Sequence, residues 1–190
     1  MADTILVTGA AGFIGHSVAG RLLDRGERVV GLDNLNSYYD PALKHARLAQ
    51  LTPSPSFRFA QLDVADTQAL KGLIERDGVR RVVHLAAQAG VRYSLEQPFA
   101  YQHSNLAGHL SVLEACRGLG DLTHLVYASS SSVYGNRPLG SEGFSEDEPC
   151  TEPVSLYAAT KRACELMSES YRALFGFPQT GLRFFTVYGP

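Results

Sequence analysis

The sequence predicts an α/β protein built on a doubly wound, mainly parallel sheet with helices on both faces. Three observations predict this class: short apolar runs alternate with helix-like segments, closely spaced glycines follow the first run, and 45% of the 190 residues are hydrophobic against 19% charged. A chain of this length and composition forms one domain that can bury a core.

Six β-branched, apolar runs are predicted to be strands, because strands buried on both faces are continuously apolar. Four segments between them are predicted to be helices, because apolar residues such as Leu106, Leu110 and Leu113 recur at helical spacing. The strands are expected at residues 5–7, 29–32, 57–62, 82–85, 124–127 and 180–185, and the helices at residues 14–24, 67–76, 101–117 and 155–175.

The stretch at residues 135–153 is rich in glycine, proline and acidic residues and has no periodicity, so it is predicted to be a surface loop. Its acidic side chains are interpreted as a solvated face and not as a metal site; they are Glu142, Glu146, Asp147 and Glu148.

Charge and cysteine usage exclude several classes of function. Seventeen basic and nineteen acidic residues leave a net charge of -2, without the basic excess that neutralises a nucleic-acid backbone. No apolar run approaches the roughly 20 residues that cross a bilayer, and no signal-peptide pattern opens the chain. The three cysteines show no metal-ligand spacing. We therefore expect no nucleic-acid or membrane partner, no metal, and a reducing, cytoplasmic location.

The first predicted strand leads into Gly9, Gly12 and Gly15, and a predicted helix follows. Glycines at this spacing allow a sharp turn and a close approach of the backbone to a pyrophosphate. The helix N-terminus then offers free amides and a partial positive charge to the phosphates. This arrangement predicts the dinucleotide site of a Rossmann-type fold.

Asp33 ends the second predicted strand, where a carboxylate can accept both hydroxyls of an adenosine ribose and would repel the extra phosphate of NADP. NAD is therefore favoured as the cofactor. The alternative is a tight glycine turn without a ligand, in which Asp33 only caps the backbone. Asp63 follows the third predicted strand and is either an acceptor for the adenine amino group or a helix N-cap.

Tyr157 and Lys161 are four residues apart near the start of a predicted helix, so they share one face of it. A fixed cation beside a phenol lowers its pKa, which suits such a tyrosine to act as a general base toward a sugar or alcohol hydroxyl. Ser129 to Ser132 follow the fifth predicted strand, at the sheet edge where ligands bind. The alternative for Tyr157 and Lys161 is that they are merely exposed neighbours, and the alternative for the four serines is a polar loop.

Four motifs resemble the extended short-chain dehydrogenase/reductase superfamily, in its branch of nucleotide-sugar epimerases and dehydratases. They are TGAAGFIG from Thr8, HLAAQAG from His84, SSSSVYG from Ser129 and YAATK from Tyr157. The resemblance implies that Tyr157 is the base, Ser130 the reactive serine and Lys161 the residue that holds the nicotinamide ribose. It further implies that the NAD site is lined by Phe13, Ile14, Asp33, Asn34, Asp63, Val64, Leu85, Ala86, Ala87 and Asn105.

Three stretches are more similar to UDP-glucuronate 4-epimerases than to other branches: DNLNSYYD with the following LKHARL, AGVRYS, and RFFTVYGP. Dehydratases of the superfamily carry an Asp-Glu pair directly after the reactive serine, where this chain has Ser131 and Ser132, so dehydration is disfavoured. The two serines are expected to hold a sugar carboxylate, with Arg92 as a candidate charged partner. Thr186 is expected near the substrate.

The implied reaction is NAD-dependent 4-epimerisation of a UDP-sugar, UDP-glucuronate to UDP-galacturonate, through a 4-keto intermediate. Epimerases of UDP-glucose or UDP-N-acetylglucosamine and UDP-glucuronate decarboxylases share the cofactor motifs and are left open. A dinucleotide-binding module without turnover is the alternative from another class.

Members of this family commonly dimerise through two helices, which implies a homodimer through residues 101–117 and 155–175. Relatives continue past the position of Pro190 into a lobe that grips the sugar nucleotide. Residues 1–190 are therefore expected to be the NAD-binding domain of a longer epimerase, with the C-terminal substrate lobe absent. Such a chain is expected to bind NAD better than UDP-sugar and to turn over poorly.

Overall fold

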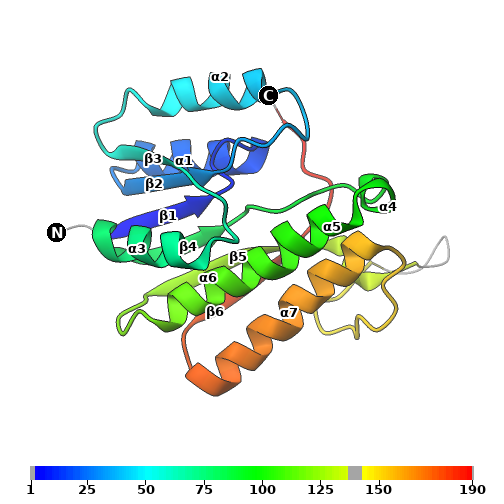
Figure 1. The fold of residues 1–190 in the computed structure, drawn as a ribbon. Coiled ribbons are helices and arrows are strands. Elements are labelled where there is room, and N and C mark those ends of the chain that lie inside the picture. Colours follow the sequence, from blue (N-terminus) through cyan, green and yellow to red (C-terminus); the bar gives the residue numbers. More distant parts are fainter. Residues whose placement is uncertain (1–2, 137–142, 190) are drawn as a thin grey trace.

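The computed structural model describes residues 3–136 and 143–189, in which six parallel strands follow the order β3-β2-β1-β4-β5-β6 (Figure 1). The chain begins at the centre of the sheet and winds outward in both directions, so the strand order reverses between β1 and β4. The six predicted strands are confirmed as β1 (Thr4–Thr8), β2 (Arg28–Asp33), β3 (Phe57–Gln61), β4 (Val79–His84), β5 (His124–Ser130) and β6 (Gln179–Phe184).

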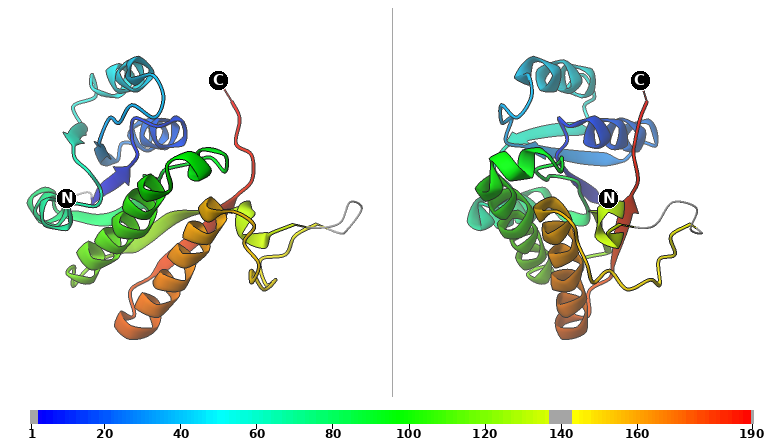
Figure 2. Two further views of the ribbon diagram at one scale, coloured as in Figure 1. Left: turned by 45° about the vertical axis from the view of Figure 1, so that its right-hand side comes forward. Right: turned by 90° about the vertical axis from the view of Figure 1, so that its right-hand side faces the viewer.

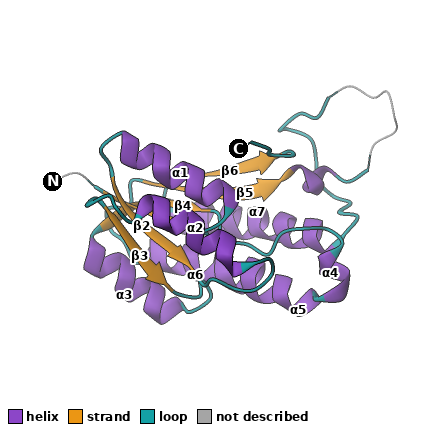
Figure 3. Ribbon diagram, turned by 90° about the horizontal axis from the view of Figure 1, so that it is seen from above, coloured by secondary structure: helices purple, strands orange, loops and turns teal. Residues whose placement is uncertain are grey.

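Helices cover both faces of this sheet, as the predicted three-layer arrangement requires (Figures 2 and 3). Right-handed crossovers place the helices that precede β2 and β3 on one face and the later helices on the other. The first face carries α1 (Phe13–Asp24) and α2 (Pro41–Leu51), and the second carries α3 (Thr67–Asp77), α6 (Gly108–Arg117) and α7 (Leu156–Phe175).

The central strand β1 separates two hydrophobic cores. Ile5 and Val7 face the core beneath α1 and α2, whereas Leu6 faces the core beneath α3 and α6, as the alternation of side chains along a strand requires. All three residues are at most 2% exposed. The two cores therefore hold the carboxyl ends of the central strands in fixed positions.

The helix predicted at residues 101–117 is wrong in its first part. A short helix α5 (Pro98–Tyr101) runs into a π-helical segment, η1 (Gln102–Ala107), and only then into α6. The wider π-helical turn changes which side chains face inward, so Asn105 and His109 are buried while Leu110 is 41% exposed. Helices α2 and α4 (Tyr93–Glu96) were not predicted.

The loop predicted at residues 135–153 is described in part. Glu146 and Asp147 are exposed, as expected of a solvated face, whereas Glu142 lies outside the described residues. Glu148 is half-buried and accepts from the Ser145 amide at 2.7 Å, so for this residue the expectation of a solvated side chain is wrong. Within residues 3–136 and 143–189, no helix has the length and apolar character needed to span a membrane.

Candidate functional site

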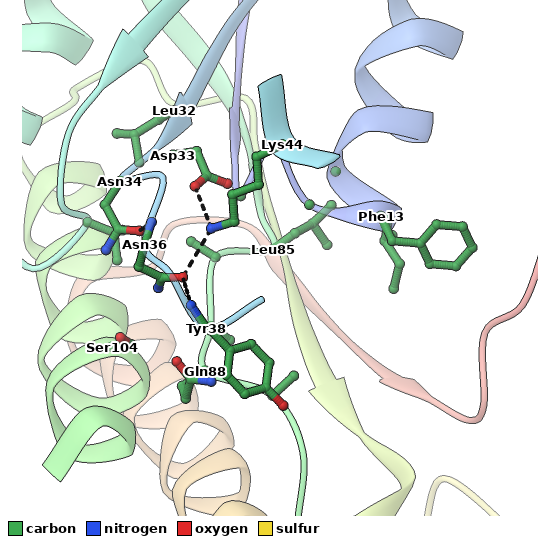
Figure 4. Close-up of a pocket in the computed structure, with 18 of the residues that line it drawn as sticks. Phe13, Leu32, Asp33, Asn34, Asn36, Tyr38, Lys44, Leu85, Gln88 and Ser104 are labelled. Carbon is green, nitrogen blue, oxygen red and sulfur yellow. Dashed lines mark hydrogen bonds and ion pairs between the residues drawn. The ribbon is translucent and has the colours of Figure 1, made fainter. Parts of the chain in front are cut away.

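A cavity of about 450 Å³ opens at the carboxyl ends of the central strands, where the strand order reverses (Figure 4). The predicted cofactor residues that line it are Gly9, Gly12, Phe13, Ile14, Gly15, Asp33, Asn34, Val64, Leu85, Ala86 and Ala87. The lining residues that were not predicted are Leu32, Asn36, Tyr38, Tyr39, Leu43, Lys44, Arg47, Leu62, Gln88, Ala89, Ser104, Ala128 and Phe184.

The glycine turn forms the wall of the cavity beside α1, and two of its glycines leave no room for a side chain. Gly9 has a φ of +73°, and a Cβ there would lie 2.9 Å from the Ala86 amide nitrogen. A Cβ at Gly15 would lie 2.0 Å from the Gly9 carbonyl oxygen. Gly12, the N-cap of α1, provides no side-chain cap, so the first-turn amides lack a side-chain acceptor at the cap. The turn therefore presents bare backbone and a helix N-terminus to the cavity.

Asp33 lies at the end of β2, as predicted, and is 6% exposed. Its Oδ1 atom accepts from the Leu35 amide at 2.8 Å and from Lys44 Nζ at 3.2 Å. Its Oδ2 atom accepts one longer bond, 3.3 Å, from the Ala11 amide. The carboxylate is thus fixed in orientation and paired with the buried ammonium of Lys44, a pairing that was not predicted.

Asp63 stands beside the cavity, and Val64 after it contributes to the lining. Asp63 accepts from the side chain of Asn34 at 3.2 Å, contacts His103 Nε2 at the same distance, and accepts from the Ala65 amide at 2.9 Å. Burial acts to raise the pKa of Asp63, but these hydrogen bonds outweigh it, so the pKa is lowered. The N-cap reading of Asp63 is wrong, because Asp66 caps α3.

Asn105 does not line the cavity but supports its wall from behind. Its side chain accepts from the Gln88 amide at 2.8 Å and donates to the Gln88 carbonyl oxygen at 3.1 Å and to Thr160 Oγ1 at 3.0 Å. It therefore joins the loop after β4 to α7, and the π-helical turn is what points it inward.

Tyr157 and Ser130 come together at the carboxyl end of β5, and neither is among the residues that line the cavity. Ser155 caps the N-terminus of α7 by accepting from the Ala158 amide at 3.0 Å, so Tyr157 lies in the first turn of that helix. Burial raises the pKa of Tyr157, and the nearby Ser130 side chain acts in the opposite direction. The two predicted catalytic side chains therefore lie close to each other.

Lys161 lies one turn beyond Tyr157 on α7, as predicted, and is 5% exposed. Its Nζ atom donates to the Ala128 carbonyl oxygen at 2.9 Å, and Ala128 lines the cavity. Burial lowers the pKa of Lys161. The expectation that Lys161 lowers the pKa of Tyr157 is wrong for the chain alone, because burial dominates at Tyr157 and raises its pKa.

The predicted substrate residues fall into two groups. Ser131 and Ser132 are half-buried in a short 3₁₀ helix, η2 (Ser131–Tyr134), whose N-cap Ser130 accepts from the Ser132 amide at 3.2 Å. Arg92 and Thr186 are exposed and do not line the cavity. The structure therefore brings the serines to the catalytic pair but not Arg92 or Thr186.

The most informative residues that were missed are Lys44 and Arg47, both on α2. A signal for this helix exists, because Asp40 accepts from the Ala42 amide at 2.9 Å and Pro41 occupies the first helical position. The burial of a lysine has no such signal, since lysines are almost always exposed.

The chain matches the family described as "NAD dependent epimerase/dehydratase family" over residues 5–190. UDP-glucuronate 4-epimerase 4 of Arabidopsis thaliana is 50% identical over 187 residues, which are 98% of this chain and 42% of that protein. UDP-glucuronate 4-epimerase of Thermodesulfobacterium geofontis is 48% identical over 185 residues, 97% of this chain and 56% of that protein.

Among solved structures, UDP-glucuronic acid 4-epimerase from Bacillus cereus, in complex with UDP-glucuronic acid and NAD, superposes with a TM-score of 0.89 at 37% identity. The match covers 98% of this chain and 58% of that chain. The chain thus spans about half the length of the relatives that it matches.

Proposed function

The chain belongs to the NAD-dependent epimerase/dehydratase family, and on that premise we propose that it carries the NAD site and the catalytic residues of a UDP-sugar 4-epimerase that converts UDP-glucuronate to UDP-galacturonate. The observation that carries this proposal is that Ser130 and Tyr157 lie close together at the carboxyl end of β5, a strand whose Ala128 lines the cavity. The relatives named UDP-glucuronate 4-epimerase support the choice of sugar. Residues 1–190 are the NAD-binding domain in this proposal.

The residues present fit NAD. The walls at Gly9 and Gly15 admit no Cβ, which suits close contact with a pyrophosphate, and the α1 N-terminus offers amides to the same group. Asp33 would accept from the adenosine ribose, and Asp63 and Asn34 would face the adenine. Lys161 would hold the nicotinamide ribose.

NAD⁺, when bound, would supply a reversible hydride acceptor, so that C4 of the sugar can be inverted without net oxidation. Tyr157 would take the proton from the sugar 4-hydroxyl and give it back to the inverted hydroxyl. The Ser130 hydroxyl would hydrogen-bond to the same sugar oxygen. Because burial raises the pKa of Tyr157, the proton transfer would become faster as the pH rises above neutral.

A 4-keto glucuronate is a β-keto acid, which loses carbon dioxide when its C5–carboxylate bond stands perpendicular to the carbonyl plane. We propose that the hydroxyls of Ser131 and Ser132 hold the carboxylate away from that alignment. Arg92 and Thr186 would approach the sugar nucleotide from the exposed rim. This would separate the epimerase from a decarboxylase with the same cofactor residues.

The test is to incubate the chain with NAD and, separately, UDP-glucuronate, UDP-glucose and UDP-N-acetylglucosamine, and to identify the products by proton NMR. We expect slow formation of UDP-galacturonate, because a chain that spans about half the length of its relatives is expected to turn over poorly, and we expect no UDP-pentose. Tyr157→Phe should form no product while it still binds NAD. A UDP-pentose product would identify a decarboxylase. If C4 were inverted only in UDP-glucose or UDP-N-acetylglucosamine, the assigned substrate would change to that sugar nucleotide. A lack of C4 inversion with all three sugar nucleotides would overturn the proposal.

We also propose a homodimer through the helices at residues 101–117 and 155–175. Leu156 and Leu174 are about five turns apart on one face of α7, and both are exposed, as is Leu110 on α6. Light scattering should give twice the chain mass, and Leu110→Glu should give a monomer. A reducing cytoplasm is the proposed location, because Cys116, Cys150 and Cys164 are free and buried.

A further inference from the structure

Lys44 is the most unusual charged residue in the cavity. It is 5% exposed, although a lysine on a surface helix normally extends its ammonium into water. Its Nζ atom donates to Asp33 Oδ1 at 3.2 Å and to Asn36 Oδ1 at 3.1 Å (Figure 4). An ammonium loses much hydration energy when it is buried, so a folded chain keeps one there only where specific partners compensate.

The loop between β2 and α2 is wound so that Lys44 can reach back to Asp33. The Asn34 side chain accepts from the Asn36 amide at 3.1 Å, and the Asp40 side chain starts α2. Leu35 has a φ of +55°, a conformation that a leucine rarely adopts, and its amide donates to Asp33 Oδ1. Side-chain hydrogen bonds and a strained residue therefore both serve to bring Lys44 to the carboxylate.

Both members of the pair line the cavity and both retain hydrogen-bonding capacity. Asp33 Oδ1 already accepts from Leu35 and Lys44, whereas within residues 3–136 and 143–189 Oδ2 has only the 3.3 Å bond from Ala11. An ammonium has three N–H groups, and Asp33 and Asn36 take two of those of Lys44. The third has no hydrogen-bond acceptor among the described residues, and the Nζ atom lies 5.3 Å from the centroid of the Tyr39 ring. One acceptor beside one donor is the complement of two adjacent hydroxyl groups, of which one donates and the other accepts.

The other cation in the lining does not offer the same donor. Arg47 Nη1 donates to the Tyr39 hydroxyl at 3.0 Å and to the Ala11 carbonyl oxygen at 3.4 Å. Its guanidinium is therefore directed at the glycine turn and at Tyr39, and it makes no contact with Asp33 among the interactions of the described residues. Of the two cations in the lining, Lys44 is the one paired with the carboxylate.

We propose that Lys44 is a specificity-determining residue for the adenosine ribose: it orients Asp33 so that Oδ2 accepts from one ribose hydroxyl, and its own third N–H donates to the adjacent one. This inference rests on the proposed cofactor. It assigns to α2 a direct part in reading the ribose, in addition to the carboxylate at the end of β2.

The test is isothermal titration of the 190-residue chain with NAD, 2′-deoxy-NAD and 3′-deoxy-NAD. The unmodified chain should bind NAD at least tenfold more tightly than either deoxy ligand. Lys44→Met should weaken NAD binding at least tenfold and should bring the affinity for one deoxy ligand within twofold of that for NAD. The matched control is Lys71→Met, which removes a lysine from an ion pair with Glu114 on the outer surface and should leave all three affinities unchanged.

Removal of Lys44 leaves the Asp33 charge buried without its partner, so a second variant keeps the test decisive if the first does not fold. Asp33→Asn combined with Lys44→Met gives a neutral pair, which should retain the circular dichroism of the unmodified chain and lose the discrimination between NAD and both deoxy ligands. If the variants bind all three ligands more weakly but by the same factor, Lys44 is merely structural and the inference is wrong, while the cofactor proposal stands. If the unmodified chain does not bind NAD, both are wrong.

Discussion

Lys161 on α7 and Ala128 on β5 are joined by a hydrogen bond of 2.9 Å from the ammonium to the carbonyl oxygen. The bond ties the helix that carries Tyr157 to the strand that carries Ser130. Because burial lowers the pKa of Lys161, the chain keeps a cation where its charge is unfavourable. A group retained at such a cost is typical of a functional site.

Lys161→Met should therefore separate stability from binding. Methionine has a similar length and no charge, so the free energy of unfolding should change by no more than about 1 kcal/mol, because the lost hydrogen bond is offset by the relief of burial. NAD affinity should fall at least tenfold. Urea unfolding and calorimetric titration measure the two quantities. A large loss of stability with unchanged affinity would assign Lys161 a structural role only.

The glycine turn predicts opposite effects for two glycine-to-alanine substitutions in helices. In Gly15→Ala the new Cβ would lie 2.0 Å from the Gly9 carbonyl oxygen, so the turn must shift and NAD affinity should fall at least tenfold. Gly72 on α3 has open space, and Gly72→Ala should stabilise the chain by about 0.5–1 kcal/mol. Thermal unfolding with and without NAD measures both effects. If Gly15→Ala and Gly72→Ala changed NAD affinity by the same factor, the close packing at Gly15 would not matter for binding.

Glu165, one turn after Lys161, holds Arg183 of β6 through Nε at 2.9 Å and Nη2 at 3.2 Å, and accepts from Ser129 at 2.6 Å. The carboxylate is largely buried, so Glu165→Gln should lower the free energy of unfolding by about 3 kcal/mol. The control is Glu169→Gln, which breaks an exposed pair with Arg172 and should leave the free energy of unfolding nearly unchanged, because water screens exposed charges. Urea unfolding measures the free energy of unfolding of both variants. Equal losses in the two variants would show that the buried pair of Glu165 and Arg183 contributes no more than the exposed one.

The buried histidines predict a loss of stability in weak acid. Burial lowers the pKa of His109 to about 3 and that of His84 well below its ordinary value, with Lys161 nearby adding to both effects. Both are neutral in the folded chain but take up protons near pH 6.5 when it unfolds, so stability is present above pH 6.5 and falls as the pH decreases.

Between pH 6 and pH 5 the two histidines together should remove about 2 kcal/mol from the free energy of unfolding. Denaturant titrations at four values from pH 5 to pH 8 measure this slope. The exposed His45 provides the control, since His45→Gln should leave the slope unchanged. A stability that does not vary between pH 5 and pH 7 would show that the two rings are protonated in the fold.

The strands and the glycine turn could be predicted because their residues follow local rules. A parallel strand buried on both faces is a continuous apolar run, and β1 is buried at every position. The motif at Gly9 to Gly15 has a steric cause that the sequence displays directly. Tyr157 and Lys161 were placed correctly because their spacing alone sets them on one helix face.

The remainder depends on contacts between distant elements. Nothing local indicates that Lys44 turns inward to Asp33, or that a π-helical turn directs Asn105 toward Gln88. The pKa of Tyr157 was predicted in the wrong direction, because its sign depends on burial, which a spacing of four residues does not reveal. The site was thus predictable in its residue types and not in its pairings.

The central claim, that this chain forms an NAD site in which Asp33 and the glycine turn hold the dinucleotide, is tested most directly by titrating the unmodified chain with NAD in a calorimeter. The account predicts a single site per chain with a micromolar or lower dissociation constant. Absence of binding at millimolar NAD, with the chain folded by circular dichroism, would contradict it.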